Sequence, residues 1–173
     1  MNLNIIAAIN NNRVIGDSRY NGLLWKNNQD LLLFKKLTLN SYLIMGKNTW
    51  ESLNCPYLPK RFNSVISSNY KELNELWKSP KLEFFESIDS SINYIKNHQI
   101  KGFNDEIFFI GGLSIYKEAL KYDIKTVYLS KINNNINGDL IFPDFEKNFY
   151  LKVRASFNGF EQYVYKKIGE ALS

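Results

Sequence analysis

Cysteine and histidine are almost absent from this sequence of 173 residues, which contains one of each, Cys55 and His98. A single cysteine excludes an internal disulfide and any metal site built from several thiolates, and we expect no metal centre. A catalytic triad would have to use the one histidine, which argues against a serine hydrolase. We expect Cys55 to be an inert thiol, because no histidine lies near it, and His98 to have a surface role near a helix end.

Long apolar runs and clustered charge are absent as well. The N-terminal stretch "MNLNIIAAIN" has no basic residue before its short apolar run, unlike a signal peptide, and no segment is long enough to span a bilayer. The 22 lysines and arginines exceed the 17 acidic residues and give a net charge of +5, but the lysines are scattered. We therefore expect a cytoplasmic protein without a nucleic-acid or membrane partner, whose charge is compatible with anionic small ligands.

What is present is an alternation of strand and helix patterns, without repeats or linkers, which predicts a single domain over residues 1–173. Strands are predicted over residues 3–9, 42–46, 63–69, 106–112 and 125–132, and helices around Asp30 and over residues 47–53, 87–100 and 113–122. Residues 10–22 and 70–82 are predicted loops, and Asn158-Gly159 predicts a hairpin within residues 149–168. The alternation indicates an α/β fold, with a mainly parallel sheet, helices on both faces and an antiparallel C-terminal hairpin.

Three of these strands end in residues suited to bind phosphate. "FFIGGLSIY" runs from a strand through Gly111-Gly112 into a helix, so backbone N–H groups can face an anion. "MGKNTW" places Lys47 at a helix start, and "ISSN" presents Ser67 and Ser68. Each pattern alone is also typical of an ordinary turn. Together, at the carboxyl ends of parallel strands, they favour a dinucleotide or another polyphosphate ligand.

Asp30 lies at the start of the predicted helix in "NNQDLLLFKK". At about 100° per residue, Leu33, Phe34 and Leu37 fall within about 60° of it, whereas the two lysines after Phe34 do not. Two interpretations remain open. An acid in the first helical turn gains from the helix dipole and needs no further role. Alternatively, Asp30 is a partly desolvated carboxylate with a raised pKa that binds a cationic or hydrogen-bond-donating ring.

Trp25 and Arg61 are the other candidate ligand contacts in the first half of the chain. Trp25 offers a flat apolar wall and one N–H donor, although core packing explains it equally well. Arg61 follows a proline turn in "CPYLPKRFN" and is suited to bidentate binding of a carboxylate, although most surface arginines are only solvated.

Taken together, these motifs resemble dihydrofolate reductase. "IIAAINNNRVIG" is similar to the first strand of that family and the start of its mobile loop, and "WKNNQDLLLFKKLT" to its tryptophan and acid-bearing helix. "IMGKNTWESL" resembles the cofactor-binding turn, "IFFIGGLSIY" the glycine pair, and "YLSKINNNINGDLIFPDF" the late strand followed by Gly-Asp and Phe-Pro. The blocks occur in the order and at the spacing of the family. The resemblance implies a sheet of about eight strands and a monomer.

The resemblance also implies a reaction: NADPH-dependent reduction of 7,8-dihydrofolate to tetrahydrofolate, by hydride transfer to pterin C6 and protonation at N5. Asp30 would hold the pterin N3 and 2-amino group and promote protonation, Ser130 would hydrogen-bond the acid or the pterin, and Trp25 would position a water. The implied substrate-binding residues are Ile6, Ala8, Leu31, Phe34, Thr49, Tyr57, Leu58, Arg61 and Ile110. The implied cofactor-binding residues are Ala8, Ile15, Gly16, Gly46, Lys47, Asn48, Thr49, Ser67, Ser68, Ile110, Gly111, Gly112, Leu113, Ser114, Ile115 and Tyr116.

Departures from the family pattern keep two alternatives open. The loop from Gly16 to Trp25 is about two residues longer than the common bacterial form, and Leu24 replaces a proline, which prompts the hypothesis of a folate- or nucleotide-binding protein with little turnover. A riboflavin-pathway reductase of similar fold is the other alternative, although a phosphosugar site has no need for a buried acid such as Asp30. One extra residue in "CPYLPKR" leaves open whether Tyr57 or Leu58 contacts the folate tail.

Overall fold

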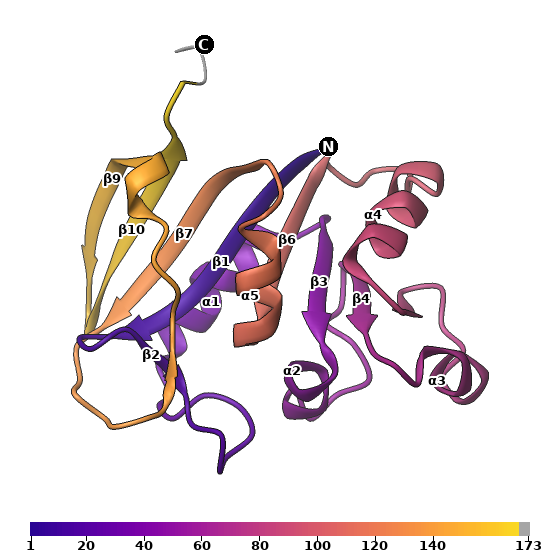
Figure 1. Cartoon of the computed structure of the whole chain (residues 1–173), viewed down its shortest axis with the longest axis horizontal. Helices are drawn as coiled ribbons and strands as arrows, with labels where there is room; N and C mark the ends of the chain where they lie inside the picture. The colour runs from indigo at the N-terminus through magenta and orange to yellow at the C-terminus, as the bar shows by residue number, and fades with distance from the viewer. Residues whose placement is uncertain (170–173) are drawn as a thin grey trace.

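One eight-stranded sheet organises the computed structural model, which describes residues 1–169 (Figure 1). Its strand order is β5-β4-β3-β6-β1-β7-β10-β9. The strands are β1 (Asn2–Asn10), β3 (Tyr42–Gly46), β4 (Phe62–Ile66), β5 (Leu82–Phe85), β6 (Glu106–Gly111), β7 (Ile124–Ile132), β9 (Phe149–Phe157) and β10 (Phe160–Lys167). All pairs from β5 to β7 are parallel, and β10 pairs antiparallel with both β7 and β9. The predicted α/β fold is confirmed.

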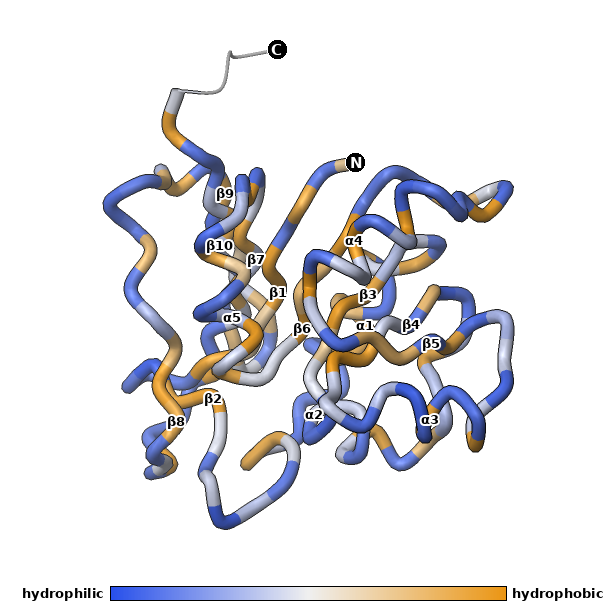
Figure 2. The backbone as a smooth tube through the Cα atoms, turned by 45° about the vertical axis from the view of Figure 1, so that its right-hand side comes forward, coloured by the Kyte–Doolittle hydropathy of each residue, from blue (hydrophilic) through white to orange (hydrophobic). Residues whose placement is uncertain are grey.

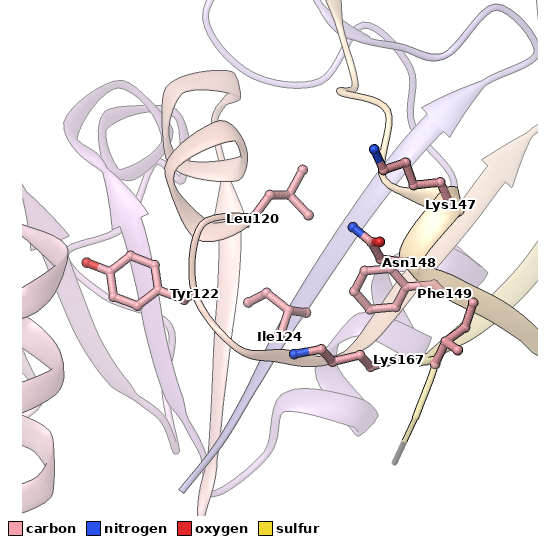
Figure 3. Close-up of a pocket in the computed structure, with 8 residues that line it drawn as sticks. Leu120, Tyr122, Ile124, Lys147, Asn148, Phe149 and Lys167 are labelled. Atoms are coloured by element: carbon pink, nitrogen blue, oxygen red, sulfur yellow. The ribbon is translucent and has the colours of Figure 1, made fainter.

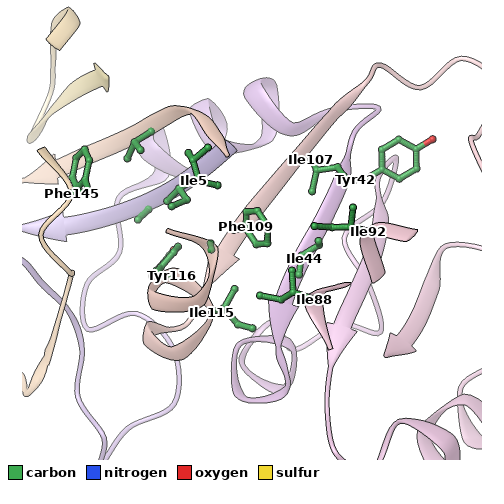
Figure 4. Packing of buried hydrophobic residues seen from close by; sticks show 14 of the residues in the cluster. Ile5, Tyr42, Ile44, Ile88, Ile92, Ile107, Phe109, Ile115, Tyr116 and Phe145 are labelled. Atoms are coloured by element: carbon green, nitrogen blue, oxygen red, sulfur yellow. The ribbon is translucent and has the colours of Figure 1, made fainter. Parts of the chain in front are cut away.

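Helices cover both faces of the sheet, as predicted. They are α1 (Asn28–Thr38), α2 (Lys47–Ser52), α3 (Tyr70–Leu76), α4 (Ile88–Asn97) and α5 (Leu113–Ala119), with a short 3₁₀ helix at Glu146–Asn148. The apolar side chains of α4 and α5 pack on one face of the sheet (Figure 4), and those of α1, α2 and α3 pack on the other. Ser87 caps α4, since its side chain accepts a hydrogen bond from the Ser90 backbone N–H.

The apolar run of β1 is explained by burial on both faces. Ile5 and Ile9 belong to the cluster beneath α4 and α5, whereas Ile6 belongs to the cluster beneath α1. Successive side chains of a strand point to opposite faces, so a strand covered on both sides is apolar without alternation. Figure 2 shows these hydrophobic segments in the central strands, with hydrophilic segments mostly outside them.

Two predicted loops contain regular structure. Residues 70–82 include α3, and the last of them, Leu82, begins β5. The strand β5 was not predicted. Residues 10–22 include β2 (Val14–Gly16), which pairs antiparallel with β8 (Leu140–Ile141) in a separate two-stranded sheet. The strand predicted over 63–69 ends at Ile66, so Ser67 and Ser68 follow it. His98 follows the last residue of α4 and is exposed, as expected of a surface residue. Its ring stacks on the ring of Tyr94.

Candidate active site

A cleft of about 1400 Å³ opens at the carboxyl ends of β1, β3 and β6, between the sheet and α1. Its position agrees with the general rule that open α/β sheets bind ligands beyond the carboxyl ends of their strands. Drug-sized ligands occupy pockets of roughly 300–1,000 Å³, so this cleft has room for two ligands side by side.

Asp30 is the buried acid of the cleft. Its backbone N–H donates to the Asn27 side chain at 3.0 Å, which caps α1, and its own side chain is turned inward so that the residue is only 7% exposed. Leu33, Phe34 and Leu37 line the same cleft, as the helical geometry predicts. Burial raises the pKa of Asp30, and a hydrogen bond from the Ser130 side chain partly opposes the increase. The acid therefore serves as a cap-region residue and a pocket residue at once.

The glycine pair lines the cleft at the end of β6. Gly111 has φ +119°, and a Cβ there would lie 3.2 Å from the Tyr116 hydroxyl oxygen, so a side chain would be both strained and crowded. That hydroxyl donates to the Ile6 carbonyl at 2.9 Å, and burial raises the pKa of Tyr116. The Gly111-Gly112 peptide bond is cis. Because neither glycine has a side chain, a ligand can approach the backbone closely here.

Lys47 provides the cationic side of the cleft. It begins α2 directly after Gly46, and neither this helix nor α5 has a side-chain cap at its N-terminus. The Lys47 ammonium lies 3.7 Å from a Glu51 carboxylate oxygen in a partly exposed ion pair. A surface pair of this kind contributes little to stability, so Lys47 can turn toward an anionic ligand.

The loop of residues 16–25, called the lid below, lines one side of the cleft with its residues 16–23. Within it, the Arg19 guanidinium Nε lies 2.9 Å from Asp17 Oδ1. The Ser18 backbone N–H donates to Asp139 Oδ1 at 2.7 Å, which ties the lid to the loop before β8. At Gly138 a Cβ would lie 2.3 Å from the Gly16 carbonyl oxygen, so the two loops cross where only glycine fits.

Arg61 is 3% exposed and reaches the cleft from the segment before β4. Its Nε donates to the Pro59 carbonyl at 2.9 Å, and its Nη1 donates to the Thr38 hydroxyl at 3.2 Å. Burial lowers the pKa of Arg61. These two contacts fix the guanidinium plane and leave its remaining N–H donors available to a ligand.

Most residues expected from the sequence meet in this cleft. The lining includes Ile6, Ala8, Ile15, Gly16, Asp30, Leu31, Phe34, Gly46, Lys47, Asn48, Thr49, Leu58, Arg61, Ile110, Gly111, Gly112, Leu113, Ser114, Ile115, Tyr116 and Ser130. Trp25, Tyr57, Ser67 and Ser68 are not part of the lining. The Trp25 indole N–H is nevertheless buried and has no hydrogen-bond partner within residues 1–169. Of the two tail candidates, Leu58 reaches the cleft and Tyr57 does not.

Several lining residues were missed by the sequence reasoning. Tyr128 stands two residues before Ser130, and strand periodicity alone would have put both on one face. Gln162 lines the cleft from β10, which no local pattern indicates. Lys35 was placed away from Asp30 by the helical angle, yet its long side chain reaches the cleft wall. Lid residues 17–23 also line the cleft.

A second cavity, of about 300 Å³, lies near the start of β7, away from the cleft (Figure 3). Leu120, Ile124 and Phe149 line it together with the basic residues Lys147 and Lys167, and its lining contains no acid. Within residues 1–169, no group of three or more metal-ligating side chains is placed to hold an ion, and no helix is both long and apolar enough to cross a bilayer.

The fold and the cleft together define a class: an α/β protein with a cleft large enough for two ligands, lined by a buried acid and by strand ends suited to bind phosphate. Comparison with known proteins narrows this class. The sequence pattern described as dihydrofolate reductase matches residues 2–167. The chain belongs to the dihydrofolate reductase family, and it is therefore an oxidoreductase that reduces dihydrofolate with NADPH.

Individual relatives agree with this assignment. A dihydrofolate reductase of Buchnera aphidicola subsp. Acyrthosiphon pisum is 42% identical over 153 residues, covering 88% of this chain and 85% of the relative. Dihydrofolate reductase type 6 of Proteus mirabilis is 31% identical over 166 residues, covering 96% and 97%. The solved structure of an Enterococcus faecalis dihydrofolate reductase complexed with NADP(H) and RAB-propyl has a TM-score of 0.78, at 22% identity and 96% coverage of each chain. These matches favour this family over the riboflavin-pathway alternative.

Proposed function

We propose that the cleft brings the nicotinamide ring and the pterin ring together, with Asp30 as the acid that holds the pterin. NADPH, when bound, supplies the hydride, which passes to pterin C6. The chain supplies orientation, exclusion of water and one carboxylate, which suffice for hydride transfer between two stacked rings. The observation that carries this proposal is the carboxyl of Asp30, which is buried in a cleft with room for two ligands.

The catalytic proposal assigns proton handling to Asp30 and supporting roles to Ser130 and Trp25. Asp30 accepts hydrogen bonds from pterin N3 and the 2-amino group and promotes protonation at N5. Its raised pKa supports this role, since a larger fraction of such a carboxyl is protonated at a given pH and can donate its proton. Ser130 holds the carboxylate in place. The buried and unpartnered Trp25 N–H supports a role in holding a water.

The remaining assignments follow the walls of the cleft. Ile6, Ala8, Leu31, Phe34, Thr49 and Ile110 would surround the rings, while Leu58 and Arg61 would bind the benzoyl-glutamate tail, with Tyr57 behind Leu58. Ile15, Gly16, Gly46, Asn48 and residues 111–116 would contact NADPH, with Ser67 and Ser68 beyond β4 toward its adenosine end. The bare backbone at Gly111 supports close approach of this cofactor.

Replacing Lys47 with alanine is expected to raise the Michaelis constant for NADPH by about tenfold, on the scale of one charge-assisted hydrogen bond. The Michaelis constant for NADH should change little, because NADH lacks the 2′-phosphate that we propose Lys47 binds. Steady-state kinetics with both cofactors checks this. Glu51→Gln, which removes only the ion-pair partner of Lys47, is the control. An equal rise for both cofactors would show that Lys47 does not read the 2′-phosphate.

The reaction itself is tested by the absorbance of NADPH. Saturable oxidation that depends on dihydrofolate supports the proposed function. Tight binding of both ligands without turnover would instead support the binding protein that the longer lid suggested. We also propose that the protein is a monomer, because one chain provides every wall of the cleft. The mass of the native protein in solution tests this. The cytoplasmic location expected from the sequence remains a proposal.

A further inference from the structure

Ala8, Ser130 and Gln162 form one row across three neighbouring strands. Ala8 of β1 is paired with Ser130 of β7, and Ser130 is paired with Gln162 of β10. All three line the cleft. Directly paired residues on antiparallel strands share one face of the sheet, with Cβ atoms about 4.5–5.5 Å apart. Gln162 therefore stands beside the serine that hydrogen-bonds Asp30.

Gln162 stands between two apolar residues on its face of β10, and the next polar residue on this face, Lys166, donates to the Thr126 hydroxyl at 2.6 Å. Its neighbours on this face, two residues away in each direction, are Phe160 and Val164, which are 3% and 9% exposed. A residue that only filled space here would be expected to be apolar too, since burying an amide costs free energy unless it is hydrogen-bonded. Within residues 1–169 the half-buried Gln162 side chain forms no such bond. Its two N–H donors and its carbonyl oxygen are open to the cleft.

The ligand proposed for this end of the cleft has a matching requirement. An exocyclic amino group carries two hydrogens, and Asp30 can accept only one of them while it also accepts from the ring N–H. The second hydrogen needs another acceptor, because an unpaired donor in a buried site costs about 1–3 kcal/mol. The next acceptor along the row, beyond Ser130, is the Gln162 carbonyl oxygen.

We propose that Gln162 is a specificity-determining residue, whose carboxamide hydrogen-bonds the 2-amino group of the pterin directly or through one water. This inference rests on the proposed orientation of the ring against Asp30. On this proposal, the row formed by Ala8, Ser130 and Gln162 is the part of the cleft that distinguishes a ring with a 2-amino group from a ring without it. Sites built to hydrogen-bond a polar group discriminate strongly against an analogue that lacks it.

The test uses two aryl pyrimidines as probes, a 2,4-diamino compound and its 4-amino analogue without the 2-amino group. Gln162→Met keeps the length of the side chain and removes its hydrogen bonds. We expect this variant to raise the dissociation constant of the diamino compound by about 5- to 20-fold, the effect of losing one buried hydrogen bond. The dissociation constant of the analogue should remain nearly unchanged. Quenching of intrinsic fluorescence measures both, and the Michaelis constant for NADPH should not change.

Glu161→Met is the control for ligand binding, because Glu161 is the preceding residue on β10, points to the other face and does not line the cleft, although it also loses the ion pair with Arg154. If Gln162→Met unfolds at a lower temperature than the wild type, Gln162→Ala repeats the comparison with a smaller side chain. If the dissociation constants of both probes rise equally, or if neither rises, the role of Gln162 is refuted. A wild-type protein that does not distinguish the probes would instead refute the orientation against Asp30, and this inference with it.

Discussion

Replacing Asp30 with asparagine is expected to lower kcat by on the order of 100-fold or more near pH 7, the scale of losing a proton-transfer group. Asparagine is close to aspartate in shape, so α1 and the cleft should persist, and NADPH should bind as before. Stopped-flow measurement of hydride transfer, together with NADPH binding by fluorescence, checks both expectations. Near-normal turnover at pH 7 would refute the assigned role of Asp30.

The same variant should be more stable than the wild type at neutral pH. Burial raises the pKa of Asp30 in the folded state, so the folded chain keeps this proton at a pH where the unfolded chain has released it. The contribution of Asp30 to stability is then fully present below its unfolded pKa and is lost as pH rises through its folded pKa. Asparagine has no such loss. Urea unfolding across this pH range should show a difference that disappears under acid conditions, and Asp105→Asn, at an exposed site, is the control.

Gly138→Ala is expected to lower both stability and kcat/KM. The new methyl group would lie 2.3 Å from the Gly16 carbonyl oxygen and 2.6 Å from Val14 Cγ1, so β2 and β8 must separate. Such overpacking typically costs about 1–3 kcal/mol. The shift would also pull Asp139 away from the Ser18 N–H, so the lid should lose its anchor and kcat/KM should fall by about tenfold, on the scale of a misplaced active-site loop. Thermal unfolding and steady-state kinetics measure the two effects.

Gly102→Ala is the control for this variant. Nothing lies within 4 Å of a Cβ at Gly102, whose φ of +85° makes alanine strained without crowding it. It should therefore cost some stability and leave kcat/KM unchanged. Unchanged stability and kinetics in Gly138→Ala would mean that the lid does not depend on this crossing.

The fold was predictable wherever a segment carries its own signal. The run of β1 and the Asn158-Gly159 hairpin are local patterns, and both were confirmed. The helix α3 was missed because only Tyr70 and Leu73 of its seven residues pack against the core, so its sequence is as polar as a loop. The strand β5 depends on a tertiary contact: the Asn74 side chain bonds both the N–H and the carbonyl of Phe84, at 2.9 Å each.

The site was predictable to the extent that its residues follow strand ends. Asp30 and its apolar neighbours could be grouped from helical geometry, and Gly111 from the strand-to-helix junction. Gln162 could not be found in this way, because its place in the cleft depends on the register of β10 against β7. The Ser18–Asp139 contact joins positions 121 residues apart, and only the folded chain brings them together.

The size of the cleft has a consequence for the life of the protein in a cell. Apolar side chains such as Leu31 and Phe34 face this space, so bound ligands act as a removable part of the core. A ligand present at 100 times its dissociation constant adds about 2.7 kcal/mol to the apparent stability. Because proteases attack the unfolded fraction, such a gain can change the steady-state abundance of a protein several-fold. The amount of this enzyme that escapes degradation should therefore follow the supply of its own substrate and cofactor.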